Sequence, residues 1–134
     1  DVNFKTIKFV EEKVTSFLKK NDIKFPLAKI LLLGLAYKKN IDDYRESASL
    51  KLFDHLSKKR VKKIKFYDPY FKKNNVPKNI NLLKKLTSKN LIKFDLVVLV
   101  TDHDSFDYKF INKHAKKIID CRGRFSLSDK VIRG

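Results

Sequence analysis

The sequence predicts an α/β domain of three layers, with helices on both faces of a mostly parallel sheet and an N-terminal helix before the first strand. Residues 29–36 and 94–100 form almost entirely apolar runs, as expected of parallel strands that are buried on both faces. Segments with apolar residues at helical spacing alternate with these runs. Strands that alternate with helices favour βαβ units with right-handed crossovers, which is the arrangement of a Rossmann-like domain.

The first helix is predicted over residues 2–20. Its apolar positions recur at helical spacing opposite a charged face: Ile7, Val10, Val14, Phe17 and Leu18. Pro26 disfavours a helical conformation at Phe25, so the helix should end before that point. We therefore expect two parts, with residues 1–24 as the end of a longer linking helix and residues 25–134 as the globular domain.

The middle of the chain should contribute a second helix and a second strand. The helix is expected to begin near Ser47, a suitable N-cap, and to bury one face: Leu50, Phe53 and Leu56. The strand covers residues 64–67 and is ended by Asp68 and Pro69. Residues 70–90 are rich in Asn and Lys, and a short helix is predicted there near residues 82–86.

The last third of the chain continues the alternation. The third strand is the apolar run 94–100, and a short helix is predicted over residues 106–113. Residues 118–119 form a fourth strand that ends at Asp120. The pattern assigns no strand or helix beyond this point.

Composition limits the class of protein. At 134 residues, with 43% hydrophobic residues and eleven Phe, the chain should fold as a single domain with a real core. No apolar run approaches the roughly 18 residues of a membrane helix, and no signal peptide is visible. One Cys excludes an internal disulfide framework and fits a reducing, cytoplasmic compartment. The chain starts with Asp1 and contains no Met, so we expect a fragment of a longer protein.

The net charge of +17 predicts anionic partners such as nucleic acid, a membrane surface or phosphorylated metabolites. The lysines occur in pairs along the whole chain. This spread favours solvated surface lysine over a dedicated face for polyanions. A small basic nucleic-acid-binding module stays open as the alternative, and its best feature is the run KKRVKK at residues 58–63.

Polar residues follow every predicted strand, and the carboxyl ends of parallel strands lie along one edge of a sheet. They are Tyr37 and Lys38, then Asp68, then Thr101, Asp102 and His103, and finally Asp120, Arg122 and Arg124. A cleft lined by Lys38 and Arg122 would suit a phosphate or pyrophosphate. The alternative is that Asp and Arg at this edge only pair with each other. No G-x-G-x-x-G follows the first strand, so side chains would have to bind the phosphate.

Four ordered blocks carry a family resemblance. They are GLAYK at 34–38 followed by RES at 45–47, YDP at 67–69, VVLVTDHDSF at 97–106, and DCRG at 120–123. Together they resemble the C-terminal domain of UDP-glucose/GDP-mannose dehydrogenases, over residues 28–125. Ala48 departs from the pattern, because many members have Pro after R-E-S.

The resemblance implies that residues 25–134 are the UDP-binding domain of an NAD-dependent nucleotide-sugar 6-dehydrogenase, which oxidises the C6 alcohol of a UDP-sugar to a carboxylate. The implied partners are the UDP-sugar and the N-terminal and central domains of the same enzyme, as a homodimer, without specific nucleic acid or membrane. Those domains would hold most of the NAD and the catalytic Cys, so this chain alone should bind and not turn over. The segment 100–108 leans towards the branch that uses UDP-N-acetylhexosamines.

Residue by residue, the resemblance implies that Lys38, with Tyr37 beside it, contacts the sugar nucleotide, and that Arg122 contacts the UDP moiety. It implies that Arg45 reaches the phosphates of NAD. No catalytic residue and no metal ligand is expected. Cys121 is interpreted as a small packed residue. The three histidines lack metal-ligand spacing: His55 and His114 are interpreted as surface residues, and His103 as bordering the cleft. Arg124 should point away from Arg122 if the chain stays extended.

Overall fold

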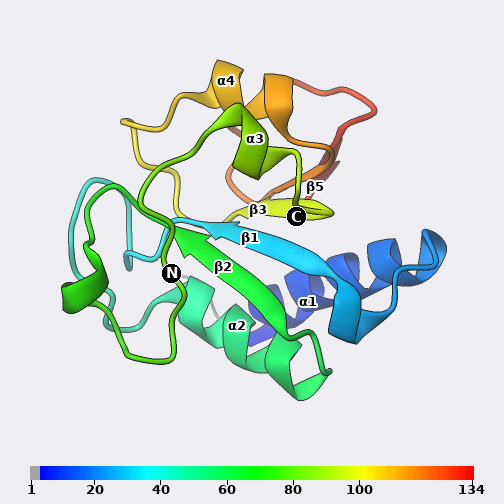
Figure 1. Cartoon of the computed structure of the whole chain (residues 1–134), viewed down its shortest axis with the longest axis horizontal. Coiled ribbons are helices and arrows are strands. Elements are labelled where there is room, and N and C mark those ends of the chain that lie inside the picture. Colours follow the sequence, from blue (N-terminus) through cyan, green and yellow to red (C-terminus); the bar gives the residue numbers. More distant parts are fainter. Residues whose placement is uncertain (1–3) are drawn as a thin grey trace.

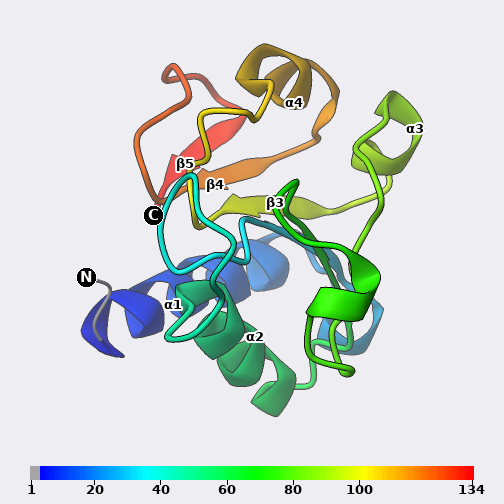
Figure 2. The same ribbon diagram turned by 90° about the vertical axis from the view of Figure 1, so that its left-hand side faces the viewer.

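The protein forms a five-stranded parallel sheet between two layers of helices (Figures 1 and 2). A computed structural model describes residues 4–134. The strand order is β2-β1-β3-β4-β5, and every pair is parallel. The strands are β1 (Lys29–Leu33), β2 (Lys63–Tyr67), β3 (Leu96–Leu99), β4 (Ile118–Asp120) and β5 (Val131–Arg133). The predicted three-layer α/β fold is confirmed.

Two helices lie on each face of the sheet. Helices α1 (Phe4–Lys20) and α2 (Ala48–Lys58) cover one face, and α3 (Ser88–Leu91) and α4 (Tyr108–His114) cover the other (Figure 2). Two single-turn 3-10 helices, η1 (Phe25–Leu27) and η2 (Lys73–Asn75), lie in connections. Within the described part of the chain, each helix is too short or too polar to cross a membrane.

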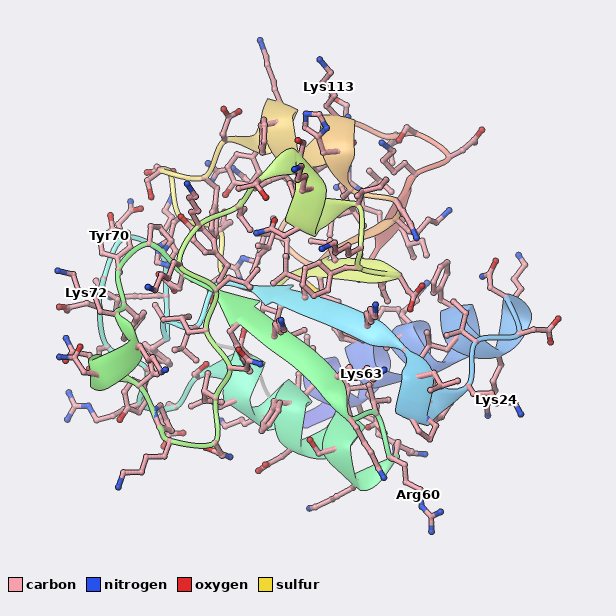
Figure 3. The ribbon with its side chains drawn as sticks, viewed as in Figure 1. Lys24, Arg60, Lys63, Tyr70, Lys72 and Lys113 are labelled. Carbon is pink, nitrogen blue, oxygen red and sulfur yellow. The ribbon has the colours of Figure 1, made fainter. Side chains whose placement is uncertain are left out.

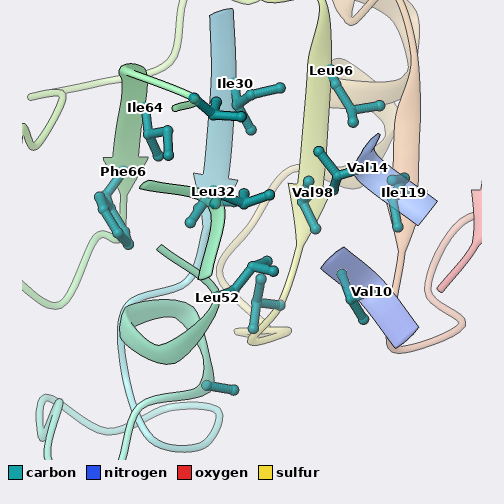
Figure 4. Packing of buried hydrophobic residues seen from close by; sticks show 14 of the residues in the cluster. Val10, Val14, Ile30, Leu32, Leu52, Ile64, Phe66, Leu96, Val98 and Ile119 are labelled. Atoms are coloured by element: carbon teal, nitrogen blue, oxygen red, sulfur yellow. The ribbon is translucent and has the colours of Figure 1, made fainter. Parts of the chain in front are cut away.

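Strand β1 contributes side chains to the cores on both faces of the sheet, which explains its continuous apolar run. Ile30 and Leu32 face α1 and α2, whereas Leu31 and Leu33 face α3 and α4. All four side chains are fully buried. Figure 4 shows Ile30 opposite Leu96 and Leu32 opposite Val98 of β3, on the same face as the helical residues Leu52 and Val10.

Helix α1 packs into the domain core. Its apolar stripe, which includes Val14 and Leu18, belongs to the same cluster as β1. Glu11 is 3% exposed, and its Oε1 lies 2.9 Å from Nδ1 of His55 in α2. The His55 side chain is 22% exposed, so its interpretation as a surface residue holds only in part: the imidazole also pairs with a carboxylate buried between two helices.

Helix α2 begins as predicted. The Ser47 hydroxyl accepts a hydrogen bond from the amide of Leu50. Arg60 follows the helix with a φ of 71° and Val61 is buried, so the basic run 58–63 forms the turn between α2 and β2.

The prediction of a helix near residues 82–86 was wrong. Leu82 instead forms an isolated parallel bridge with Phe66 of β2. The Phe66 amide donates to the carbonyl of Asn81, and the Leu83 amide donates to the carbonyl of Phe66, both at 2.8 Å. This segment satisfies backbone groups at the outer edge of β2. The helix begins later, at Ser88, where Thr87 and Asn90 form a capping box.

Strand β5 was not predicted. Its apolar part is only the pair Val131 and Ile132, and a long connection separates them from β4. The strand pairs in parallel with the open edge of β4, in a register that places Arg133 opposite Asp120. The short helix of the last third runs from Tyr108 to His114, and Asp107 caps it at the N-terminus.

Candidate functional site

The loop that follows β1 turns sharply at Gly34. This residue has a φ of +92°, and a Cβ built there would lie 2.5 Å from both Cβ and the carbonyl oxygen of Thr101. The Ser49 hydroxyl donates a hydrogen bond to the Gly34 carbonyl. Because only glycine fits this close approach, the chain can leave the sheet immediately and run along the carboxyl ends of the strands.

A second contact joins this loop to Thr101, which follows β3. Thr101 Oγ1 donates to the carbonyl of Ala36 at 2.8 Å, and the Tyr37 amide donates to the carbonyl of Asp43 at 2.7 Å. The loop therefore closes on itself over residues 37–43, with Tyr37 and Lys38 both exposed.

Two arginines that follow β4 share one carboxylate. Asp102 Oδ1 lies 3.3 Å from Arg122 Nε, and Asp102 Oδ2 lies 2.9 Å from Arg124 Nη1. Arg124 also pairs with Asp104 at 3.1 Å and stacks over the Tyr108 ring at 4.6 Å. The expectation that Arg124 points away from Arg122 was wrong. Residues two apart share a side even in an extended chain, and here the chain turns after β4 and brings both arginines to Asp102.

That turn is built around Asp120, which is 2% exposed. Its Oδ1 accepts from the amides of Arg122 and Gly123 at 3.0 and 2.8 Å, and its Oδ2 lies 2.8 Å from Arg133 Nη1. Arg124 and Arg133 thus pair with Asp102 and Asp120, and we interpret both arginines as structural residues. Arg122 also pairs with Asp102, but it differs from Arg124 and Arg133 because it lines the pocket described next.

A pocket of about 130 Å³ lies where the ends of β1, β3 and β4 meet. Its lining is Tyr37, Lys38, Lys39, Glu46, Ala48, Val100, Thr101, Asp102 and Arg122. Three residues predicted for the substrate, Tyr37, Lys38 and Arg122, are therefore brought together. Asp102 was considered only as a strand-end residue, and its position directly after the third apolar run was the signal for its place here.

Arg45, the residue expected to face the cofactor, lies outside this pocket. Its side chain is 86% exposed, and its Nη2 donates to Asp43 Oδ2 at 2.7 Å. Hydrogen bonds from the Arg45 side chain and backbone hold the pKa of Asp43 down to about 2. The pair keeps the guanidinium on the outer side of the loop.

His103 does not border the pocket. It is fully buried, behind the loop, with Nε2 at 2.8 Å from Asp68 Oδ2. His114 is half-buried, so it lies at the surface as interpreted, with its ring 4.6 Å from that of Phe110. Residues 4–134 contain no group of three or more His, Cys, Asp or Glu side chains arranged to hold a metal ion.

Cys121 carries no activated thiol. Burial raises its pKa to about 12, and the adjacent Asp120 carboxylate acts in the same direction against the opposing effect of Arg122. The thiol packs at the edge of the core that contains β1. This agrees with its interpretation as a small packed residue.

Basic side chains are spread over the surface. Figure 3 shows Lys24, Arg60, Lys72 and Lys113 on different sides of the molecule. The charge of +17 is therefore not gathered at the pocket alone.

Comparison with known proteins identifies a family and a fold. Residues 31–126 match the model of the UDP-glucose/GDP-mannose dehydrogenase family, UDP binding domain. The UDP-N-acetyl-D-mannosamine dehydrogenase of Methanococcus vannielii is 31% identical over 88% of this chain and 26% of that protein.

Solved structures show the same fold. The UDP-D-ManNAc dehydrogenase of Pyrococcus horikoshii superposes with a TM-score of 0.72 at 30% identity, over 94% of this chain and 29% of that one. The NDP-N-acetyl-D-galactosaminuronic acid dehydrogenase of Methanosarcina mazei shares the fold with a TM-score of 0.73 at 22% identity. The chain spans only 26% to 29% of the length of the first two relatives. With its four sequence blocks gathered at one edge of a parallel sheet, this chain belongs to the UDP-glucose/GDP-mannose dehydrogenase family as its UDP binding domain.

Proposed function

We propose that this chain binds the UDP moiety for an NAD-dependent dehydrogenase that oxidises the C6 alcohol of a UDP-sugar to a carboxylate. The observation that carries the proposal is the pocket shared by Lys38 and Arg122 at the carboxyl edge of the sheet. Crevices at this edge are the usual ligand sites of open α/β sheets. UDP-N-acetylhexosamine is the proposed sugar class, and the names of the relatives in Methanococcus and Pyrococcus support it.

The pocket suits the phosphates of a nucleotide. Arg122 offers a planar fork of donors, and Asp102 holds that fork at its Nε side. Lys38 supplies a second, mobile positive charge across the pocket. Tyr37, 46% exposed, offers a flat surface beside it. Each charge-assisted hydrogen bond to phosphate would contribute roughly 1.5–3 kcal/mol.

The pocket holds only part of a UDP-sugar. Its volume of about 130 Å³ lies below the roughly 300–1,000 Å³ of complete small-molecule sites. We infer that other domains of a longer, homodimeric cytoplasmic enzyme complete the site and supply the catalytic thiol. In this arrangement residues 1–24 end a linking helix, and residues 25–134 form the UDP-binding domain.

The only part of NAD that we expect this chain to contact is its phosphates. The loop after β1 has no G-x-G-x-x-G to cradle a pyrophosphate. Arg45 is the one group assigned to the cofactor, and its exposed position outside the pocket supports a contact with a separately bound phosphate. In the whole enzyme, NAD would accept the hydride. The proposed product is a uronate for polysaccharide biosynthesis.

Calorimetric titration of the chain with UDP, UDP-N-acetylglucosamine and UDP-glucose tests the proposal, with a DNA duplex as the fourth ligand. We expect UDP and its sugars to bind with similar affinity, because the sugar contacts lie mostly in the other domains. DNA should bind only through charge, at roughly 10⁻⁴–10⁻⁶ M, and release as salt rises. Salt-resistant, sequence-selective binding of DNA, without binding of UDP, would favour the nucleic-acid module instead.

A further inference from the structure

A buried carboxylate–imidazole pair lies behind the pocket and joins the loops that follow β1, β2 and β3. Asp68 follows β2 and is 1% exposed, whereas His103 follows β3 and is fully buried. Asp68 Oδ2 lies 2.8 Å from His103 Nε2. Neither residue lines the pocket. Their burial therefore needs a reason other than direct contact with ligand.

The hydrogen bonds give this pair a defined direction. The Asn40 amide donates to His103 Nδ1 at 2.8 Å, so Nδ1 is the acceptor nitrogen of the ring. The ring proton then lies on Nε2, which donates to Asp68. The loop amide of Asn40 thus donates to the imidazole, and the imidazole donates in turn to the carboxylate.

Asp68 binds three further backbone amides. Its Oδ2 accepts from Leu35 and Ala36 at 2.7 and 3.0 Å, and its Oδ1 accepts from Tyr70 at 2.9 Å. Every partner of the carboxyl group is a donor, as a carboxylate requires. Without it, buried amides of the loop would lose their acceptor.

These contacts hold the loop on both sides of the proposed substrate residues. Leu35 and Ala36 precede Tyr37 and Lys38, and Asn40 follows them. Asn40 has a φ of 65°, a conformation that non-glycine residues adopt at a cost, and its backbone amide is the group that His103 accepts. The buried pair therefore holds the backbone on both sides of the short segment that carries both side chains, together with the bonds between the Asn40 side chain and Asp104.

We propose that Asp68 and His103 are positioning residues, which set the place of Tyr37 and Lys38 for nucleotide binding without touching the nucleotide. This rests on the proposed function of the pocket. A solely structural pair would stabilise the fold and leave the affinity for UDP unchanged. If the pair positions the loop, its loss should both loosen the backbone of residues 35–40 and weaken the affinity for UDP.

The chain offers a matched control in the pair Glu11 and His55. It also joins a buried carboxylate to an imidazole, at 2.9 Å, but between α1 and α2. His103→Leu and His55→Leu should both lower the stability of the fold. Only His103→Leu should speed the exchange of the Asn40 amide, by roughly tenfold or more beyond global unfolding, and raise the Kd for UDP by about tenfold.

Two conservative variants separate the functions of the ring nitrogens. His103→Asn places an oxygen near the position of Nδ1, so it should restore protection of the Asn40 amide. His103→Gln places an amide nitrogen near Nε2, so it should keep the contact with Asp68 and leave Asn40 unprotected. These variants also serve if His103→Leu fails to fold.

Equal amide exchange at residues 35–40 in the His103 and His55 variants would overturn the proposal. An unchanged Kd for UDP in a variant whose loop has lost protection would do the same. If the wild-type chain binds no UDP, the proposed function fails, whereas amide exchange still decides whether the pair holds the loop.

Discussion

Replacement of Gly34 by Ala should destabilise the protein more than an ordinary change of glycine. The residue has a φ of +92°, and the new methyl carbon would lie 2.5 Å from Cβ and the carbonyl oxygen of Thr101 and 2.8 Å from its amide nitrogen. Two of these three atoms are backbone atoms of the chain that leaves β3, so a change of rotamer cannot remove the clash.

Two costs add at this position. A left-handed conformation costs a residue with a side chain roughly 1–2 kcal/mol, and an extra methyl group in a packed region typically costs about 1–3 kcal/mol. The free energy of unfolding should therefore fall by roughly 2–5 kcal/mol. With an unfolding entropy of about 2.1 cal/mol/K per residue, this lowers Tm by roughly 7–18 °C.

Gly123→Ala is the matched control. Gly123 also has a positive φ, of +73°, but a Cβ there would meet only Arg133 Nη1, at an ordinary contact distance of 3.7 Å. It should cost only the roughly 1–2 kcal/mol of the left-handed conformation. Urea unfolding followed by circular dichroism measures both variants. Equal losses of stability would show that the close approach of β1 to Thr101 does not exist.

Four further predictions concern the site. Arg122→Ala should raise the Kd for UDP roughly 10- to 150-fold, for a lost contact of about 1.5–3 kcal/mol, with Arg122→Lys recovering only part; Arg60→Ala, at the amino ends of the strands, should leave calorimetric affinity unchanged. In the longer enzyme, Lys38→Ala should raise the KM for the UDP-sugar more than that for NAD, and Arg45→Ala should do the reverse; equal effects on one substrate would reject the division of roles. The pKa of the Cys121 thiol is raised to about 12, so the neutral thiol dominates at all lower pH. Iodoacetamide at pH about 8 should therefore alkylate the native chain at least 100-fold more slowly than the unfolded chain. Similar rates would mean an accessible thiolate. The chain alone should reduce no NAD with any UDP-sugar, and turnover lost on changing Cys121 to Ser would contradict the assignment of the thiol to another domain.

Much of the fold could be predicted from periodicity. Residues 30–33 of β1 and all of β3 are buried on both faces, so each of them had to be apolar, and the pattern was visible from the local sequence alone. The apolar stripes of α1 and α2 were also visible, because residues at helical spacing share the one face that each helix buries. By contrast, β5 and the bridge at Leu82 depend on which strand edge lies open, and this is a property of the assembled sheet.

The candidate site divides in the same way. Position after a strand was enough to predict that Tyr37, Lys38 and Arg122 would meet at one edge, because parallel strands share their carboxyl ends. The partners of those residues could not be predicted. Asp102 holds both Arg122 and Arg124 because β3 lies between β1 and β4 in the sheet.

The sequence by itself thus determined the layers, the parallel sheet, the family and the edge that carries the pocket, since each follows from local pattern or ordered motifs. Only the tertiary structure decided which charges pair, which histidine is buried and which amides Asp68 accepts. Those contacts join residues that are distant in the sequence, such as Asp68 with Leu35 and His103. Their geometry depends on the order of strands, and no local pattern of residues encodes it.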